Sequence, residues 1–423
     1  WSESEQEKSF YYLATIKTIE RDYEQALEFI ENSLLKNLHN LKARGLKTVL
    51  LRKMGRVDEA KSWAEETNAI DPFDLLTLNE RKLLNDRTIQ FPFTIRAENF
   101  NFVIEAASDY ASYSCYKEAI DLLDRIEPKG PMIHYLLAYY YFRIGDLAAS
   151  WKELKTAAES DPSYCFPNRI EDIAVLNFAI KQNPVDSYAY YYLGNLFYDK
   201  KQYRKALSAW KKSTELNDHF ATSWRNLAIV LWNKEKKPQE AIAAMENAFS
   251  LDPKDARILF ELDQLYKKAN YPIHNRLENL ERNQFLLEKR DDLYTEYITL
   301  LNLSGQYEKA LEKISGHIFH PWEGGEGKIT AQYKIAHLEM AKKALAEKEP
   351  EEAEHHLLEA LTYPLNLGEG KLIGTKDNDI YYFLGCCYEQ TGNKNKAVEA
   401  WESAVAGSDE ISGEMYYYDQ PAD

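Results

Sequence analysis

The chain has 423 residues, of which 45% are hydrophobic and 28% are charged, a composition typical of a folded soluble protein and too apolar for a disordered one. It carries 52 Lys and Arg residues against 68 Asp and Glu residues, and the resulting net charge of −16 argues against a generally basic nucleic-acid-binding surface. Gly (17) and Pro (14) are scarce, which favours long regular elements. Because every apolar run is far shorter than a membrane requires, no spanning segment is expected.

Residues 1–86 are predicted to form helix hairpins. Ala26 and Ala60 are 34 residues apart, and each follows a polar turn. Residues 87–97 are expected to be a connecting loop. Residues 98–184 are expected to form less regular hairpins together with one extra helix that ends near Pro184.

The region 185–423 shows the clearest internal repeats, and its best unit runs from Tyr188 to Asn217. The first half of this unit places an apolar or small residue at each of the positions i, i+3, i+4 and i+7 of one helical face: Tyr190, Leu193, Gly194 and Phe197. A polar turn follows, and then a second apolar stripe: Tyr203, Ala206, Leu207 and Trp210. The arrangement recurs around Ala228 and again around Gly385, so these residues are predicted to build consecutive helix hairpins.

This pattern resembles the tetratricopeptide repeat, a helix–turn–helix of 34 residues with a Trp, Leu, Gly and Tyr pattern in its first helix, alanines in its second and a closing Pro. The small residues Gly194, Ala228 and Gly385 allow the two helices of a hairpin to approach, while Trp, Tyr and Leu fill the space between them. The resemblance implies an all-α fold, a right-handed superhelical solenoid of about nine hairpins in one continuous array. Such an array exceeds the minimum of roughly three repeats that a stable solenoid needs.

Two loops share a pattern that general tetratricopeptide proteins lack. Residues 320–328 read HPWEGGEGK and residues 363–371 read YPLNLGEGK, so both end in Gly-Glu-Gly-Lys; we call them the GEGK loops. With the segments 260–268, 290–297 and 377–389, they resemble large bacterial proteins in which a mutarotase-like β-supersandwich domain of unknown function precedes a long repeat region. The resemblance implies a cytoplasmic protein, related to carbohydrates in one reading, of which this chain is a fragment without the β domain.

The GEGK loops admit two interpretations. Free backbone N–H groups at the start of the helix expected after each loop, with Lys328 and Lys371 beside them, suit an anion, although both loops lack the first Gly and the Ser or Thr of a P-loop. Alternatively Glu326 and Glu369 accept sugar hydroxyls beside Trp322, and this glycan site would also include Glu323 and Asn366. Against both stands the plain structural interpretation, in which Gly turns and Glu caps merely join hairpins. The sequence leaves the choice open.

A second candidate site lies on the first helices of the central repeats, which line the concave face in proteins of this kind. Asn195, Asn226 and Arg257 are spaced by 31 residues, and Arg225 lies beside the second of them. The spacing resembles co-chaperone repeats that clamp a peptide carboxylate. However, Tyr191 and Glu261 stand where that clamp has basic residues. Residues 199–237 hold eight Lys and two Arg against four acidic residues, which would suit an acidic guest. A solvated face, with the long side chains on the convex side, is the interpretation that such a charge run favours.

Catalytic and metal-binding patterns are not found in the sequence. HExxH, GxSxG and Cys/His nucleophile signatures are missing, and His317 and His320 with Glu323 lack the fixed spacing of a metal site. The chain is therefore interpreted as a non-catalytic scaffold, without a cofactor or metal, that binds a protein, a peptide or its own missing β domain. The alternative is an accessory region of a carbohydrate-active enzyme, with the GEGK loops in a glycan site. Nucleic acid and membrane are not expected partners.

Overall fold

The computed structural model describes residues 3–85, 100–373 and 375–406. Within these ranges the regular elements are helices, mostly α-helices, and no strand occurs, so the predicted all-α fold of helix hairpins is confirmed. The loop expected at residues 87–97 lies outside the described residues. The chain divides into two compact units, residues 1–218 and residues 219–423, and each is described by itself.

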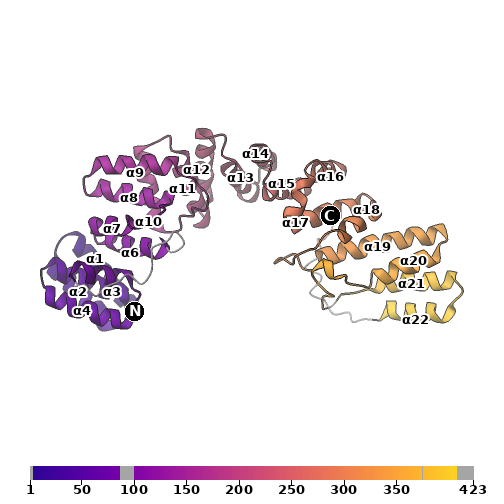
Figure 1. Cartoon of the computed structure of the whole chain (residues 1–423), viewed down its shortest axis with the longest axis horizontal. Coiled ribbons are helices and arrows are strands. Elements are labelled where there is room, and N and C mark those ends of the chain that lie inside the picture. The colour runs from indigo at the N-terminus through magenta and orange to yellow at the C-terminus, as the bar shows by residue number, and fades with distance from the viewer. Residues whose placement is uncertain (1–2, 86–99, 374, 407–423) are drawn as a thin grey trace. The chain divides into compact units, whose positions relative to one another are not determined.

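Unit 1 contains helices α1 to α12, which follow one another mostly as antiparallel pairs (Figure 1). Helix α10 occupies the segment from which a single extra helix was expected, and α5 stands without a described second helix. The bounds are α1 Glu3–Ile19, α2 Tyr23–Lys36, α3 Leu41–Lys53, α4 Val57–Ile70, α5 Leu75–Leu83, α6 Phe100–Ser112, α7 Tyr116–Leu123, α8 Pro131–Arg143, α9 Leu147–Glu159, α10 Ile170–Gln182, α11 Ser187–Asp199 and α12 Tyr203–Leu216.

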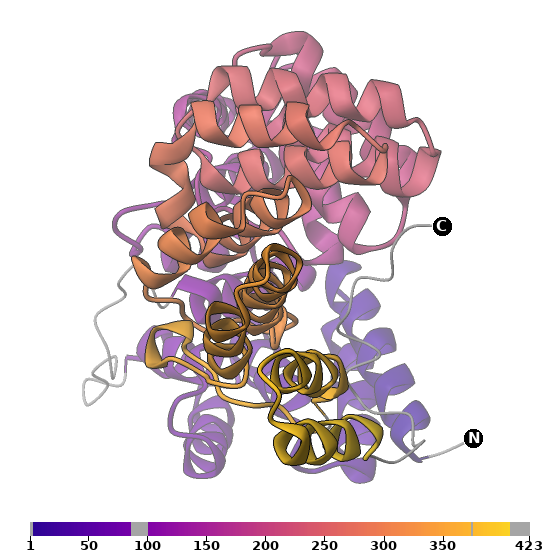
Figure 2. The same ribbon diagram turned by 90° about the vertical axis from the view of Figure 1, so that its right-hand side faces the viewer.

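Unit 2 continues the pairing from α13 to α22, and its last hairpins, drawn in yellow, face the viewer in Figure 2. Short π- or 3₁₀-helices extend three of its connections. The bounds are α13 Ala221–Val230, η2 Leu231–Glu235, α14 Pro238–Leu251, α15 Ala256–Lys268, α16 Ile273–Arg282, η3 Gln284–Lys289, α17 Asp291–Leu303, α18 Tyr307–Ser315, α19 Lys328–Glu347, α20 Pro350–Glu359, η4 Leu365–Leu367, α21 Asn378–Gln390 and α22 Lys394–Val405.

One backbone feature recurs in the turn of every described hairpin. Between the first and the second helix, one residue adopts a positive φ, which lets the chain leave the first helix and reverse within a few residues. Ten hairpins show it, against about nine predicted from the sequence. The ten residues are Arg21, Gly55, Ser114, Gly145, Lys201, Lys236, Asn270, Gly305, Lys348 and Gly392.

Several helices begin at an Asp or Asn whose side chain accepts hydrogen bonds from the first free N–H groups of the helix. Asp186 accepts from the backbone N–H groups of Tyr188 and Ala189, and Asp255 accepts in the same way at the start of α15. Because these N–H groups have no partner inside the helix, the cap stabilises the helix start. The caps thus set where the first helices begin, and the left-handed turn residues set where they end.

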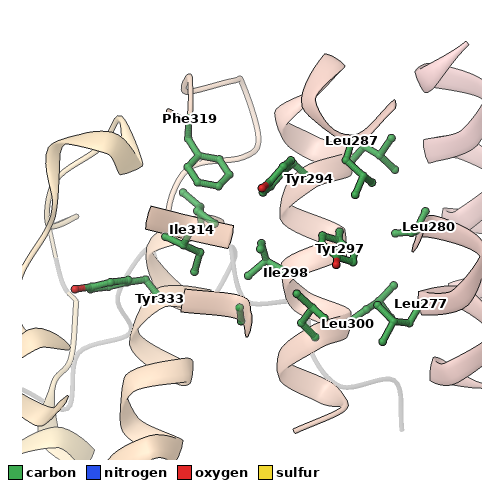
Figure 3. Close-up of a cluster of buried hydrophobic side chains, with 14 of the residues drawn as sticks. Leu277, Leu280, Leu287, Tyr294, Tyr297, Ile298, Leu300, Ile314, Phe319 and Tyr333 are labelled. Atoms are coloured by element: carbon green, nitrogen blue, oxygen red, sulfur yellow. The ribbon is translucent and has the colours of Figure 1, made fainter. Parts of the chain in front are cut away.

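Unit 2 has two clusters of buried side chains, one on or beside α19 to α22 and one mainly from α15 to α19, which Figure 3 shows. Tyr294 and Tyr297 of α17 lie at its centre, between Leu280 of α16 and Ile314 of α18. Leu367, on the second GEGK loop, belongs to the same cluster and is 1% exposed. Burying this side chain is worth about 2 kcal/mol, which anchors the loop to the hairpins.

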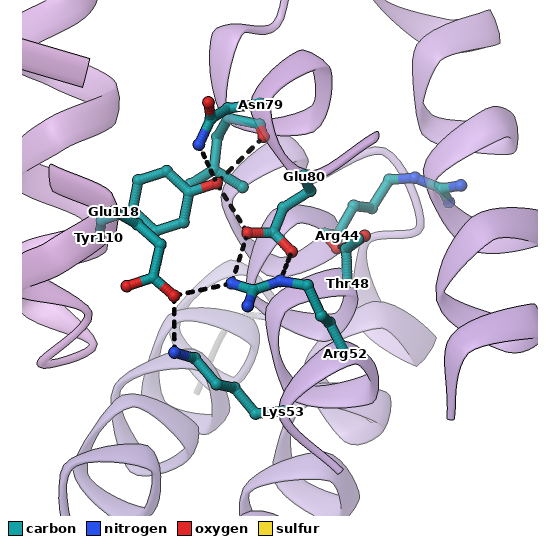
Figure 4. Close-up of polar contacts among 9 residues, drawn as sticks. Arg44, Thr48, Arg52, Lys53, Asn79, Glu80, Tyr110 and Glu118 are labelled. Atoms are coloured by element: carbon teal, nitrogen blue, oxygen red, sulfur yellow. Dashed lines mark hydrogen bonds and ion pairs between the residues drawn. The ribbon is translucent and has the colours of Figure 1, made fainter. Parts of the chain in front are cut away.

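A buried network of charged and polar groups joins α3, α5, α6 and α7 in unit 1 (Figure 4). Arg52 donates to both carboxylate oxygens of Glu80, at 2.6 and 2.9 Å, and also to Glu118 at 3.0 Å. Lys53 reaches Glu118 at 2.6 Å, and the hydroxyl of Tyr110 donates to Glu80 at 2.7 Å. Since each buried charge has a partner, the network ties neighbouring hairpins together without leaving an uncompensated charge.

No helix among the described residues is both long and apolar enough to cross a membrane. The four-part division predicted from the sequence, and the handedness of a superhelix across both units, stay predictions.

Candidate functional site

The two GEGK loops, far apart in the sequence, pack against each other in unit 2. The side-chain amide of Asn366 donates to the carbonyl oxygens of Ile314 and His317, at 2.8 and 3.0 Å. The N–H of Phe319 donates back to the carbonyl oxygen of Asn366 at 2.8 Å. At Gly368 a Cβ atom would lie 2.3 Å from the carbonyl oxygen of Phe319, so only glycine permits this contact between backbones. The two loops, together with residues 314–319 before the first of them, thus form one contact region between hairpins, which we call the joint.

Glu369 of the second loop caps the helix that begins at the end of the first loop. Its two carboxylate oxygens accept from the N–H of Gly327 at 3.1 and 3.0 Å, directly before the start of α19. The hydroxyl of Thr330 lies 3.5 Å from the same carboxylate. A carboxylate at a helix N-terminus is favourable because the N–H groups there are unpaired and carry partial positive charge. The anion that the sequence suggested at this helix start is thus supplied by the chain itself.

Lys371 is also engaged within the chain. Its ammonium lies 2.6 Å from Asp377, which also pairs with Lys334 at 2.5 Å. Burial alone would raise the pKa of Asp377, but the hydrogen bonds from the two lysines outweigh it and hold that pKa below its ordinary value. The expectation of a helix N-terminus beside both lysines holds only for Lys328, because α21 begins seven residues after Lys371.

The remaining residues proposed for this site lie at the surface of the first loop. The indole of Trp322 covers Gly325, where an added Cβ atom would lie 2.0 Å from the ring, so one ring face is occupied by the loop itself. Glu323 is exposed, and Glu326 and Lys328 are half-buried. Glu323, Glu326 and Lys328 are therefore the charged side chains of the first loop and the start of α19 that reach solvent.

Asp291, which sequence reasoning did not single out, organises the histidines beside the first loop. His317 Nε2 lies 2.7 Å from one oxygen of this carboxylate, and the other oxygen accepts from the N–H of His320 at 2.8 Å. Burial acts to raise the pKa of Asp291, but these hydrogen bonds outweigh it, so the pKa lies below its ordinary value. His317 also stacks on Tyr294, with ring centroids 4.2 Å apart. Among the described residues, no group of three acidic, His or Cys side chains is arranged to hold a metal ion.

Arg225 and Arg257 share one carboxylate on the first helices of two successive hairpins of unit 2. Arg225, on α13, donates through Nε at 2.6 Å and through Nη2 to the two oxygens of Glu261 on α15. Arg257, one turn earlier on α15, donates to Glu261 at 3.1 Å. Asn226 accepts from Arg225 at 3.2 Å. Glu261, which stands where the co-chaperone clamp has a basic residue, therefore holds the two arginines in place.

Arg257 also lines an open cleft of about 410 Å³ together with three further basic residues, Lys254, Lys289 and Arg290. Asp252 and Asp255 line it as well, but Asp252 accepts from the N–H of Lys254 and Asp255 caps α15. Sequence reasoning missed Lys289 and Arg290, because Lys289 is the last residue of the irregular η3 and Arg290 directly follows it, so both fall outside the repeat spacing.

Asn195, the remaining predicted site residue, lies on α11 in unit 1. Its side-chain oxygen accepts from Nε1 of Trp210 at 3.0 Å, across the hairpin α11–α12. The structure therefore brings Arg225, Asn226 and Arg257 together within unit 2, and it brings the GEGK residues together at the joint between hairpins.

Comparison with known families identifies the repeating element. Models described as tetratricopeptide repeat match residues 173–213 and residues 379–406, which contain most of the hairpins α11–α12 and α21–α22. These two segments match the tetratricopeptide repeat. The two matches include the hairpin of the best sequence unit, residues 188–217, in large part, and the hairpin around Gly385.

Solved structures with tetratricopeptide-like hairpins are similar at low identity. Human IFIT1 in a dimer with PPP-AAAA is 17% identical, with a TM-score of 0.30, and covers 93% of this chain and 88% of its own. MamA from Desulfovibrio magneticus RS-1 is 18% identical, with a TM-score of 0.28, over 45% of this chain and 96% of its own. YrrB, a TPR protein with an unusual peptide-binding site, is 15% identical, with a TM-score of 0.22, over 54% of this chain and 95% of its own. At these scores we draw nothing further from them.

Proposed function

We propose that this chain is a non-catalytic scaffold that binds an acidic segment of a partner protein on the first helices of unit 2. The observation that carries the proposal is the sharing of Glu261 by Arg225 and Arg257. Two guanidinium groups against one carboxylate leave an excess positive charge at a fixed place. The side chain of Arg257 is 60% exposed, whereas that of Arg225 is 14% exposed and anchors the pair.

The arrangement is suited to carboxylates for two physical reasons. A guanidinium group presents a planar set of donors that matches a carboxylate, and Glu261 already fixes the orientation of both arginines, which lowers the entropy cost of binding. Lys254, Lys289 and Arg290 around the adjoining cleft add positive charge that attracts an acidic chain. Repeat hairpins supply a rigid support for such a surface.

The identity of the partner belongs to the same proposal. The partner is a separate protein or the β domain of the same chain, as found in the longer proteins that the GEGK loops resemble. We place the interaction in the cytoplasm. The contacts of Asn366, Glu369 and Lys371 give these three residues of the second loop a structural role that needs no ligand. A glycan site therefore has less support than a protein partner.

The proposal is tested by titrating the full chain with a fluorescent peptide rich in Glu and Asp and following its polarisation. We expect Arg257→Ala to weaken binding about tenfold, since one charge-assisted contact of roughly 1.4 kcal/mol is lost. Arg282→Ala is the matched control. It removes the same charge from α16, where the side chain is 69% exposed and pairs with Glu278. Equal affinity of wild type and both variants, or no binding at all, would refute the proposal.

A further inference from the structure

Unit 1 carries a groove of about 550 Å³ that no step of the proposed function uses. Its walls come from the start of α3, from the α4–α5 connection with the start of α5, and from α6. We call it the N-terminal groove. It is more enclosed than the cleft beside Arg257, and its floor is apolar, with Leu75 and Leu76 buried beneath it.

Two phenylalanine side chains stand open on the rim of this groove. Phe73 precedes α5 and is 66% exposed, and Phe102 on the first turn of α6 is 64% exposed. Leaving two aromatic side chains in water forgoes a burial gain of about 2 kcal/mol for each. Exposed aromatic groups beside a concave surface are typical of binding sites, because a partner that covers them recovers this free energy.

Carboxylates dominate the polar part of the N-terminal groove. Among the residues that the structure describes, Asp71, Asp74, Glu105 and Asp109 line it, and Lys42 is the one basic lining residue. Asp71 accepts from the N–H of Phe73 at 2.8 Å, and Asp74 accepts from the N–H of Thr77 at 2.9 Å. The ammonium of Lys42 lies 2.8 Å from Asp109 and 3.7 Å from Glu105. Among the described lining residues the formal excess is three negative charges, and Glu105 and Asp109 are the two carboxylates that do not cap a turn or a helix in this groove.

The carboxylates also lack full compensation within the groove. Burial, with smaller repulsion from neighbouring carboxylates, raises the pKa of Asp74 and Asp109 above the ordinary value, although Thr77 and Lys42 act in the opposite direction. A cation that entered the groove would relieve this repulsion and would replace lost solvent at the carboxylates.

From the apolar walls and the charge we infer that the N-terminal groove binds a basic, apolar segment of a partner protein, with a large apolar side chain against Phe73 and Phe102 and an Arg or Lys beside Glu105 and Asp109. Neither feature alone selects this occupant. An acidic ligand is repelled, and a purely apolar one leaves the excess negative charge of the groove without a compensating cation. The groove therefore favours a basic segment, whereas the site proposed on unit 2 favours an acidic one. This inference stands or fails independently of the proposed function, because the two use different residues and opposite charges.

The test uses the full chain and a labelled peptide of alternating Arg and Leu residues. Two comparison peptides carry Glu in place of Arg, or Ser in place of Leu. We expect the Arg–Leu peptide to bind, the other two to bind at least about tenfold more weakly, and salt to weaken the complex by screening. Binding of all three peptides with similar affinity would overturn the inference.

Two variants locate the binding. Glu105→Lys and Phe102→Ser change exposed side chains of the groove, and each is expected to weaken the Arg–Leu peptide about tenfold or more. Glu65→Lys on α4 is the matched control, because it makes the same change of charge at an exposed position outside the groove and should leave affinity within about twofold. Helical circular dichroism reports whether each variant is folded.

Other occupants give distinct results that would each overturn the inference. Equal weakening by Glu65→Lys and Glu105→Lys would indicate non-specific attraction. If the wild type fails to bind and a chain with residues 86–99 replaced by Gly and Ser does bind, the occupant is this chain itself. Concentration-dependent dimers in sedimentation, lost in Phe102→Ser, would assign the groove to a second copy.

Discussion

Gly194 and Gly385 show how single residues set the spacing of the helix pairs. Each lies under a tryptophan of the second helix, 16 residues later, and an added Cβ atom would come within 2.5 Å of Trp210 or 2.1 Å of Trp401. At the same step from Ala228 the sequence has the small Ala244 instead of tryptophan. The pattern is one of matched volumes, in which a large side chain requires glycine opposite it.

We predict that Gly194→Ala destabilises unit 1 by about 1–3 kcal/mol, the usual cost of overpacking, because Trp210 is buried and cannot move aside freely. The control is Gly130→Ala, where nothing lies within 4 Å of the added atom and φ is −81°. Urea denaturation measures both. A Gly194→Ala chain as stable as the Gly130→Ala chain would contradict this packing account.

His337 and His356 form a buried pair between α19 and α20, with their Nδ1 atoms 2.9 Å apart. Burial, and then the repulsion of His356 and His355, lower the pKa of His337 to about 4, and burial also lowers the pKa of His356. Glu352 lies 3.5 Å from Nε2 of His356 and does not prevent the decrease. The pair is thus held neutral at pH 7.

This pair predicts an acid-sensitive hairpin. His337 of the unfolded chain takes up a proton as the pH falls below about 6.5, and His337 of the folded chain only near 4, so acid favours the unfolded state by about 3 kcal/mol at pH 4. His337→Gln should reduce the loss of stability between pH 7 and pH 4, whereas His274→Gln at an exposed position of α16 should not. Thermal denaturation across this range checks it, and identical pH profiles for both variants would refute it.

At the scale of elements, the hairpin turns show what the sequence can and cannot predict. Four turns could be predicted from the sequence because a glycine, which readily adopts a positive φ, stands in each of them: Gly55, Gly145, Gly305 and Gly392. In six other turns an Arg, Ser, Lys or Asn adopts the same positive φ. These residue types do little to predict a turn, so the position of the turn is set by tertiary packing. Helix pairs were therefore predictable from apolar spacing, but the turn residue was often not.

The contact between the two GEGK loops leads to a testable prediction at the scale of elements. Glu369→Ala removes the cap on the N-terminus of α19 and should destabilise unit 2 by about 1–2 kcal/mol, the usual range for a lost cap. Glu323→Ala, at an exposed position of the other loop, should change stability by less than about 0.5 kcal/mol. Denaturant titration of the two variants decides, and equal stability would show that Glu369 is not a structural cap.

Across the whole molecule, sequence reasoning located the candidate residues better than it located their partners. The repeated GEGK pattern indicated two related loops, but only the structure shows that Glu369 of one caps the helix after the other, because this contact spans 42 residues. In the same way, the spacing of Asn226 and Arg257 was visible, whereas the role of Glu261 as the partner shared by Arg225 and Arg257 was not. Contacts between hairpins depend on side-chain directions that a single sequence does not record.

The central claim is that the first helices of unit 2, and not the GEGK loops, receive an acidic partner. Hydrogen exchange of the full chain with and without a saturating acidic peptide tests it most directly, because protection of backbone N–H groups locates the bound peptide. The account predicts slower exchange in α13 and α15 (residues 221–230 and 256–268), and unchanged exchange in residues 320–328 and 363–371. Protection confined to the two GEGK loops would contradict it.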